Sequence, residues 1–178
     1  MKGDICRIAV LGDSVSTGTG VHAHESWPEL WSQKTQMSRI DNLSGAGNTS
    51  LEALQAWQAS HKNYTDVIIF IGANDALRGM PPRFLEENIS QIINMARETK
   101  IRWTIVMPDI PRNYPKQFRD SYKSTYQNLA TKYQASLLTL DYSDAKNKSM
   151  IGPDGLHPNK LGHMQLFETI QGHLDYCE

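Results

Sequence analysis

The chain of 178 residues is long enough to bury a core, and its composition, with 39% hydrophobic and 21% charged residues, is typical of one globular domain. Its 18 Lys and Arg residues against 19 Asp and Glu leave a net charge of -1, so no basic surplus predicts a nucleic-acid partner and no acidic block predicts a solvating tail. We therefore expect a single domain over residues 1–178 that does not bind nucleic acid.

The first ten residues, MKGDICRIAV, enter an apolar run without a signal-peptide pattern, and no later apolar stretch approaches the roughly 20 residues of a membrane span. We therefore expect no membrane span and a cytoplasmic location, with a periplasmic or secreted mature form that has lost its leader as the alternative. The two cysteines, Cys6 and Cys177, lack the spacing of a metal site or a disulfide framework, and we interpret both as free thiols.

Short apolar runs rich in β-branched residues predict the strands. In chain order they cover residues 8–11, a weaker run at 39–43, then 67–71, 104–107 and 137–140. Because segments of helical period separate these runs, the order predicts a parallel sheet that is covered on both faces. The expected fold is one doubly wound α/β domain with a mainly parallel five-stranded sheet.

Apolar residues recur three or four positions apart in three later segments, which predicts helices that each turn one face to the core. The stripes are Leu85, Ile89, Ile92 and Ala96, then Phe118, Tyr122, Tyr126, Leu129 and Tyr133, and last Leu161, Met164, Phe167, Ile170 and Leu174. We interpret these aromatic and methionine side chains as core residues rather than as parts of a cofactor site.

Ligands of doubly wound sheets bind beyond the carboxyl ends of the strands, so the residues that follow the predicted strands are the candidates for a site. Gly12-Asp13-Ser14 follows the first strand, NLSGAGNTS at 42–50 the second, and IGANDALRG at 71–79 the third. A fourth cluster, GPDGLHPN at 152–159, precedes the last helix. Each cluster alone is more often a turn or a helix cap than a catalytic group.

Together the clusters supply the groups that serine-based acyl transfer needs. A serine hydroxyl attacks a carbonyl only when a base removes its proton, and the base needs a third group to orient it. Ser14, His157 and Asp154 can fill these roles, because Asp154 lies three residues before His157 with a glycine between them that lets the chain bend. The N–H groups of Ser14 and Gly47 and the side chain of Asn74 are candidate donors to the oxyanion of the intermediate.

The order and spacing of these four clusters resemble the sequence blocks of the GDSL, or SGNH, hydrolase family. The segments GANDALRGMPP and IPRNYPKQF are also similar to those of its compact bacterial arylesterase, acyl-thioesterase and lysophospholipase branch. The resemblance implies a three-layer α/β/α, flavodoxin-like fold and a serine esterase for short- to medium-chain acyl or aryl esters, with thioesters and lysophospholipids as further substrates. One departure is Val15, where the family has leucine, and it affects local packing rather than the chemistry.

The resemblance also implies roles for individual residues. The implied residues are Ser14, Asp154 and His157 for catalysis and Ser14, Gly47 and Asn74 for the oxyanion hole. The loop from Asp75 to Met80 would border the acyl site, which makes Arg78 a candidate for substrate binding, and Tyr114 would form a pocket wall. The implied partner is a small-molecule ester, with no metal and no organic cofactor, and the oligomeric state is left open, a monomer included.

Three other interpretations stay open. The stretch GTGVHA at 18–23 fits the G-x-G-x-x-A fingerprint of a dinucleotide-binding module, with Asp41 about twenty residues on, but it does not directly follow the first strand. His22 and His24 favour a metal-dependent hydrolase, but no third ligand stands at a readable spacing. The last interpretation is a non-catalytic relative that binds carbohydrate or lipid. An α/β-hydrolase is not indicated, because no G-x-S-x-G elbow occurs.

Overall fold

The computed structural model describes residues 6–35, 38–60, 63–140 and 149–174. Within these residues one sheet contains the strands β1 (Cys6–Gly12), β2 (Ser38–Asn42), β3 (Asp66–Phe70), β4 (Arg102–Met107) and β5 (Ser136–Thr139). Their order in space is β2-β1-β3-β4-β5, and every neighbouring pair is parallel. The predicted strands and the parallel sheet are therefore confirmed.

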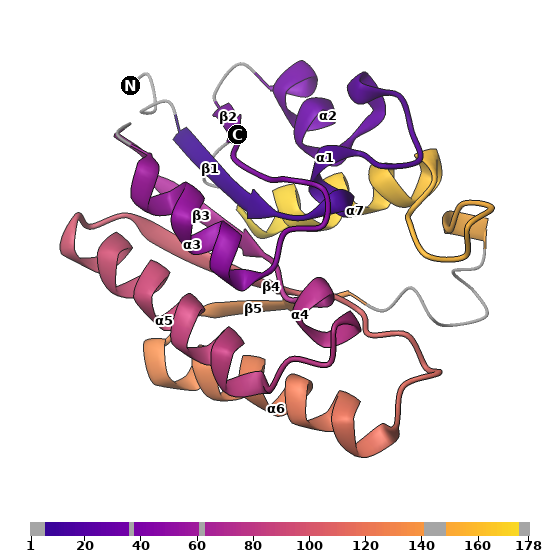
Figure 1. Cartoon of the computed structure of the whole chain (residues 1–178). Coiled ribbons are helices and arrows are strands. Elements are labelled where there is room, and N and C mark those ends of the chain that lie inside the picture. Colours follow the sequence, from indigo (N-terminus) through magenta and orange to yellow (C-terminus); the bar gives the residue numbers. More distant parts are fainter. Residues whose placement is uncertain (1–5, 36–37, 61–62, 141–148, 175–178) are drawn as a thin grey trace.

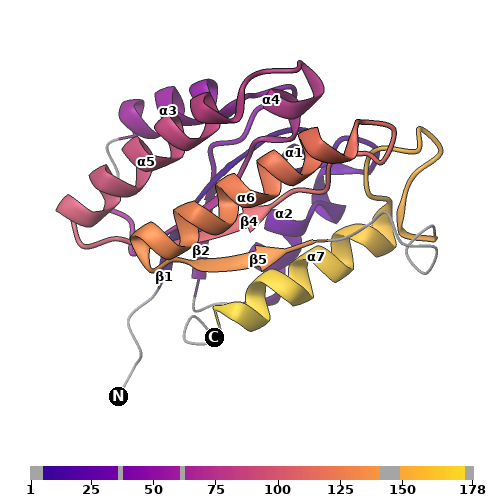
Figure 2. The same ribbon diagram turned by 90° about the horizontal axis from the view of Figure 1, so that it is seen from below.

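Helices cover both faces of this sheet. They are α1 (Ser14–Thr17), α2 (Trp27–Lys34), α3 (Ser50–Ala59), α4 (Ala73–Leu77), α5 (Pro82–Glu98), α6 (Lys116–Tyr133) and α7 (Lys160–His173), with a short 3-10 turn, η1, at Ala23–Glu25. In Figure 1, α3, α5 and α6 lie on one face of the sheet and α2 and α7 on the other, and Figure 2 shows the same layers from below. The fold is the three-layer α/β/α arrangement with the flavodoxin-like strand order.

The central strands are buried on both faces because side chains alternate along a strand. Ala9 and Leu11 of β1 pack into the cluster formed with α3, α5 and α6, whereas Ile8 and Val10 pack against the cluster formed with α2 and α7. All five residues of β3 are likewise buried. This burial explains why both strands are continuous apolar runs rather than alternating patterns.

The strand order also determines where a ligand can bind. The chain leaves β1 toward the face covered by α2, and it leaves β3 toward the face covered by α5. Adjacent strands whose connections depart to opposite faces leave a crevice between their carboxyl ends. The residues after β1 and β3 therefore lie on the two sides of this crevice.

The buried face of α7 differs from the predicted stripe. Phe167, Ile170 and Leu174 are buried as predicted, but Leu161 is 56% exposed and Leu166 is fully buried. Leu161 lies nine residues before Ile170, which is about two and a half helical turns and puts it on the opposite side of the helix. The predicted stripe was wrong at its first position because steps of three residues drift around a helix of 3.6 residues per turn.

Cys6 is buried at the start of β1 and is disulfide-bonded, so its interpretation as a free thiol is wrong. Spacing along the sequence did not reveal the bond, because a disulfide requires two cysteines that are close in space rather than in sequence. Cys177 lies outside the described residues. No helix in the described part of the chain is both long enough and apolar enough to span a membrane. The single domain over residues 1–178 and the cytoplasmic location stay predictions.

The orientation of α7 leads to a stability prediction. We expect Leu166→Ala to lower the free energy of unfolding by about 2–5 kcal/mol, because it leaves a cavity in the core, and Leu161→Ala to change it by less than about 0.5 kcal/mol. Urea unfolding of both variants and the parent protein measures the difference. Equal destabilisation by the two substitutions would contradict the orientation described for α7.

Candidate active site

Ser14 begins helix α1 directly after β1, on one side of the crevice. Asp13 caps this helix, and its carboxylate accepts the N–H of Val15 at 3.0 Å. The helix has only four residues because Gly18 turns the chain with a φ of +82° and donates its N–H to the carbonyl of Ser14. The nucleophile candidate is therefore held in a tight turn between a strand and a short helix.

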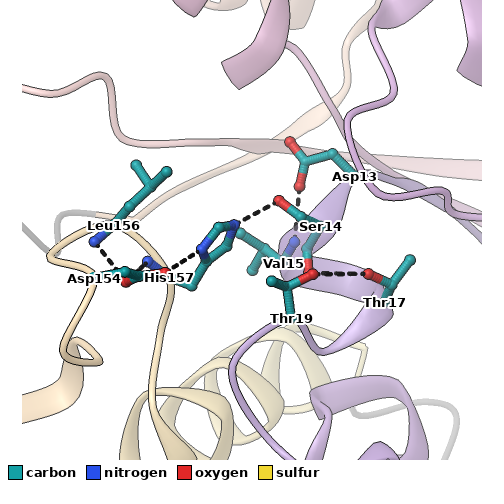
Figure 3. Close-up of polar contacts among 8 residues, drawn as sticks. All are labelled: Asp13, Ser14, Val15, Thr17, Thr19, Asp154, Leu156 and His157. Carbon is teal, nitrogen blue, oxygen red and sulfur yellow. Dashed lines mark hydrogen bonds and ion pairs between the residues drawn. The ribbon is translucent and has the colours of Figure 1, made fainter.

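His157 connects Ser14 to Asp154, as the dashed contacts in Figure 3 show. Its Nε2 lies 2.9 Å from Ser14 Oγ, and its Nδ1 lies 2.6 Å from Asp154 Oδ2. When Nδ1–H donates to the carboxylate, Nε2 is left as an acceptor for the proton of Ser14. The structure thus brings Ser14, Asp154 and His157 together, although Ser14 and His157 are 143 positions apart in the sequence.

Asp154 is held by its own loop as well as by the imidazole. Its Oδ1 accepts the N–H groups of Leu156 and His157, both at 3.0 Å, and Gly155 makes the turn between them with a φ of +69°. The hydrogen bond from His157, reinforced by these two N–H groups, lowers the pKa of Asp154 from 3.8 to about 2. At neutral pH Asp154 is a carboxylate that accepts from Nδ1 and stabilises the imidazolium form of His157.

The rest of the 149–159 loop is cross-linked around this pair. Ile151 and Pro158 form an isolated antiparallel bridge, and the N–H of Gly152 donates to the carbonyl of His157 at 2.8 Å. Asn159 donates through its side chain to the carbonyls of Ser149 and Ile151. The loop therefore supports Asp154 and His157 without any contact from Ser14.

Gly47 lies in the loop that follows β2, and Asn74 lies in helix α4, which follows β3. Gly47 has a φ of +80°, which a residue with a Cβ rarely adopts. Asn74 Nδ2 donates to the carbonyl of Asn48 at 3.0 Å, and this bond uses one of its two hydrogens. Both residues line the same cavity as Ser14 and His157, so the predicted oxyanion donors lie together with the predicted triad.

This cavity has a volume of about 590 Å³. Its apolar walls are formed by Val15, Phe70, Ala73, Leu77, Pro108, Pro111, Ile151, Leu156 and Pro158. Its size is in the range of small-molecule sites, which are mostly apolar and contain a few oriented polar groups. Pro108, Pro111 and Ile151 were not among the predicted site residues, because they come from loops whose path the sequence pattern does not predict.

Arg78 and Tyr114 do not line the cavity within the described residues. Arg78 instead donates to the carbonyl of Gly47 at 2.7 Å, and the Tyr114 hydroxyl donates to the carbonyl of Leu77 at 3.0 Å. Both side chains therefore support the loops that form the cavity wall. Contact of either residue with a substrate stays a prediction.

The residues that suggested a dinucleotide-binding module or a metal-dependent hydrolase do not have the arrangement that either function requires. Gly18 ends α1, and the next helical residues form only the short turn η1, so the 18–23 stretch does not open a helix as a dinucleotide fingerprint requires. The rings of His22 and His24 stack on one another with centroids 5.7 Å apart. In the described ranges, no group of three or more His, Cys, Asp or Glu side chains is placed to hold a metal ion.

Asp13 is a part of the site that the sequence pattern did not single out. Its side chain is only 3% exposed, and burial raises its pKa from 3.8 to about 6. The sequence shows a carboxyl group beside the predicted nucleophile, but not that the fold removes it from water. Burial makes the charged form of Asp13 more costly than in water, so the folded protein keeps Asp13 protonated up to about pH 6.

The chain is similar to known lipases, esterases and thioesterases over most of its length. The model of the GDSL-like lipase/acylhydrolase family matches residues 10–165. An arylesterase of Vibrio mimicus is 31% identical over 172 residues, which are 92% of this chain and 86% of that protein. The thioesterase 1/protease 1/lysophospholipase L1 of Escherichia coli K12 is 29% identical over 157 residues, which are 86% of this chain and 76% of that protein.

Among solved structures, the psychrotrophic esterase EstA from Pseudoalteromonas sp., inhibited by monoethylphosphonate, has a TM-score of 0.84. It is 27% identical, and the match covers 95% of this chain and 98% of that one. The similarity therefore extends over the sheet, its helical layers and the loops that carry Ser14 and His157.

The burial of Asp13 leads to a pH-dependent stability prediction. A raised pKa makes the folded state bind a proton more tightly than the unfolded chain, so the favourable contribution is complete below about pH 4 and is lost as the pH rises through about 6. Asp13→Asn keeps an acceptor for the N–H of Val15 but cannot ionise. Relative to the parent protein, we expect it to gain about 2–3 kcal/mol of stability between about pH 4 and pH 8.

Urea unfolding of Asp13→Asn and the parent protein across this pH range measures the gain. A difference between the two proteins that does not change with pH would contradict the raised pKa.

Proposed function

The chain belongs to the GDSL-like lipase/acylhydrolase family, and from this premise we propose that it is a serine esterase that hydrolyses acyl and aryl esters through an acyl-enzyme on Ser14. The observation that carries the proposal is the continuous pair of hydrogen bonds from Ser14 to His157 and from His157 to Asp154. These contacts provide a nucleophile, a base and a group that orients the base, and the nucleophile and the base line one cavity.

In the first half of the reaction, Ser14 Oγ attacks the ester carbonyl while its proton passes to His157 Nε2. The carbonyl π electrons move to the oxygen, which becomes the oxyanion of a tetrahedral intermediate. The imidazolium then donates its proton to the leaving oxygen, and the bond between the carbonyl carbon and that oxygen breaks. The alcohol leaves, and the acyl group stays on Ser14.

In the second half, a water molecule takes the place of the alcohol. His157 removes a proton from the water as its oxygen adds to the acyl carbon, which gives a second tetrahedral intermediate. When this intermediate collapses, the bond between the acyl carbon and Oγ breaks, the imidazolium returns the proton to Ser14 Oγ, and the carboxylic acid leaves. Asp154 remains ionised throughout, in line with its pKa of about 2, and stabilises each imidazolium that forms.

The oxyanion of each intermediate needs donors that are already in place. We assign the backbone N–H groups of Ser14 and Gly47 and the second hydrogen of Asn74 Nδ2 to this role. The side chain of Asn74 is restrained by its bond to the carbonyl of Asn48, which lowers the cost of orienting it during the reaction.

The cavity supports esters with an acyl or aryl group of medium size. Its apolar walls favour hydrocarbon, and its volume of about 590 Å³ exceeds what an acetyl group fills. Thioesters and lysophospholipids belong to the same proposal, since the Escherichia coli relative is named a thioesterase and a lysophospholipase. All three substrate classes place an acyl carbonyl in front of the nucleophile.

The first test removes the proposed nucleophile. We expect Ser14→Ala to lower the hydrolysis of para-nitrophenyl octanoate by at least about 1000-fold, because no other group takes over the attack. Ser124→Ala, which removes an exposed hydroxyl on α6, is the matched control and should keep the parent rate. A parallel run with a chelator separates this mechanism from a metal-dependent one.

Three results would count against the proposal. Turnover that survives Ser14→Ala would exclude Ser14 as the nucleophile, and turnover that the chelator abolishes would indicate metal-dependent hydrolysis. A folded parent protein without turnover on acyl or aryl esters would favour the non-catalytic relative that the sequence left open.

The second test measures the cavity with acyl chains of different length. We expect kcat/KM to be at least about tenfold higher for para-nitrophenyl octanoate than for the acetate, because each buried methylene contributes up to about 0.8 kcal/mol. Initial rates with both esters, kept below their critical micelle concentrations, give the ratio. Equal or lower kcat/KM for the octanoate would show that the apolar cavity does not accept the acyl chain.

A further inference from the structure

Asp75 is a buried carboxylate that the mechanism above does not use. Its side chain has no exposed surface, and it accepts two hydrogen bonds from Ser50, one from the backbone N–H at 2.8 Å and one from the hydroxyl at 2.5 Å. A charge without access to water is retained only when such donors compensate it. The fold therefore holds the buried side chain of Asp75 in contact with Ser50.

Ser50 is the first residue of α3, so this contact lies at a helix N-terminus. The positive end of the helix dipole favours a carboxylate there, and Asp75 acts as a cap supplied by another helix, α4. The Ser50 hydroxyl also accepts a bond from Asn88 Nδ2 of α5 at 2.9 Å. Its position is thus determined by a donor on one side and an acceptor on the other.

The two ends of this contact are close in sequence to the proposed oxyanion donors. Asn74 directly precedes Asp75, and Gly47 lies three residues before Ser50. A second bridge, from Asn74 Nδ2 to the carbonyl of Asn48, joins the same two segments. Arg78, which follows α4, also donates to the carbonyl of Gly47, so the loop with Gly47 and the helix with Asn74 are joined by the side chains of Asn74, Asp75 and Arg78.

We propose that Asp75 is a positioning residue of the oxyanion hole, which sets the distance between the N–H of Gly47 and the amide of Asn74 by anchoring Ser50. This inference rests on the proposed function, since it gives Asp75 a role in the same reaction. Without the anchor, α3 and α4 can move apart, and the two donors no longer converge on one oxygen. Because an oxyanion exists only in the intermediate and the flanking transition states, the loss would reduce kcat and leave KM nearly unchanged.

Asp66 provides a matched control at the other end of β3. It is also a buried carboxylate, with 2% of its side chain exposed, and it binds Arg102 through two contacts of 2.8 Å. Replacing it removes a buried charge from the same strand region but leaves the carboxyl edge of the sheet untouched. Comparing the activity of Asp75 and Asp66 variants therefore distinguishes displacement of the oxyanion donors from a general loss of folding stability.

The experiment measures kcat, KM and the pH profile of para-nitrophenyl octanoate hydrolysis for Asp75→Asn and Asp66→Asn. For Asp75→Asn we expect kcat to fall about 10- to 100-fold, with KM within about twofold of the parent value, as for a displaced oxyanion donor. The pH profile follows Asp13, whose raised pKa depends in part on the nearby charge of Asp75. For Asp66→Asn we expect kcat within about twofold of the parent value at a temperature where it is folded.

Ser50→Ala keeps the experiment decisive if Asp75→Asn does not fold. It removes the hydroxyl bond and leaves the backbone N–H to Asp75, so we expect a smaller drop in kcat, again with KM nearly unchanged. An equal drop in kcat for Asp66→Asn, or an unchanged kcat in the folded Asp75 or Ser50 variant, would overturn the proposal. These outcomes differ from failure of the esterase mechanism itself, which appears as turnover that survives Ser14→Ala.

Discussion

Parallel strand pairing is the constraint on which the rest of this structure depends. Because neighbouring strands run in the same direction, the loops that leave their carboxyl ends all emerge at one edge of the sheet. Ser14, Gly47 and Asn74 follow β1, β2 and β3 and therefore meet at this edge, although they come from distant parts of the chain. The loop before α7 adds Asp154 and His157 at the same edge, where His157 contacts Ser14.

Buried polar contacts stabilise the part of the chain that carries Ser14. A helix of four residues such as α1 is not stable by itself, because nucleation costs more than its few hydrogen bonds return. Ser16 of α1 accepts from Trp27 Nε1 at 3.3 Å, and its carbonyl accepts from Asn42 Nδ2 at 2.8 Å. The backbone N–H of Trp27 donates to Nδ1 of His163. Burial lowers the pKa of the His163 imidazole to about 4, which keeps it neutral near pH 7.

What the sequence predicts correctly here are local patterns and their order. Apolar runs indicated the strands because β1 and β3 are buried on both faces, and Gly47 indicated a turn because its φ of +80° is one that residues with a Cβ rarely adopt. Contacts between distant segments leave no such pattern. Ser50 and Asp75 are 25 positions apart, and Trp27 and His163 are 136 apart, so their bonds become visible only in the folded chain. The burial that raises the pKa of Asp13 is a property of the packing around it.

The internal bonds of the 149–159 loop have a consequence for the two halves of the reaction. Asp154, His157 and the bridge from Ile151 to Pro158 form a unit whose geometry does not depend on Ser14, apart from the single contact between Nε2 and Oγ. In the proposed acyl-enzyme, an acyl group on Oγ replaces that contact, while the hydrogen bond to Asp154 continues to hold the direction and the tautomer of the imidazole. The reorganisation energy for activating water is therefore small, because the same preassembled base serves first the serine and then the solvent.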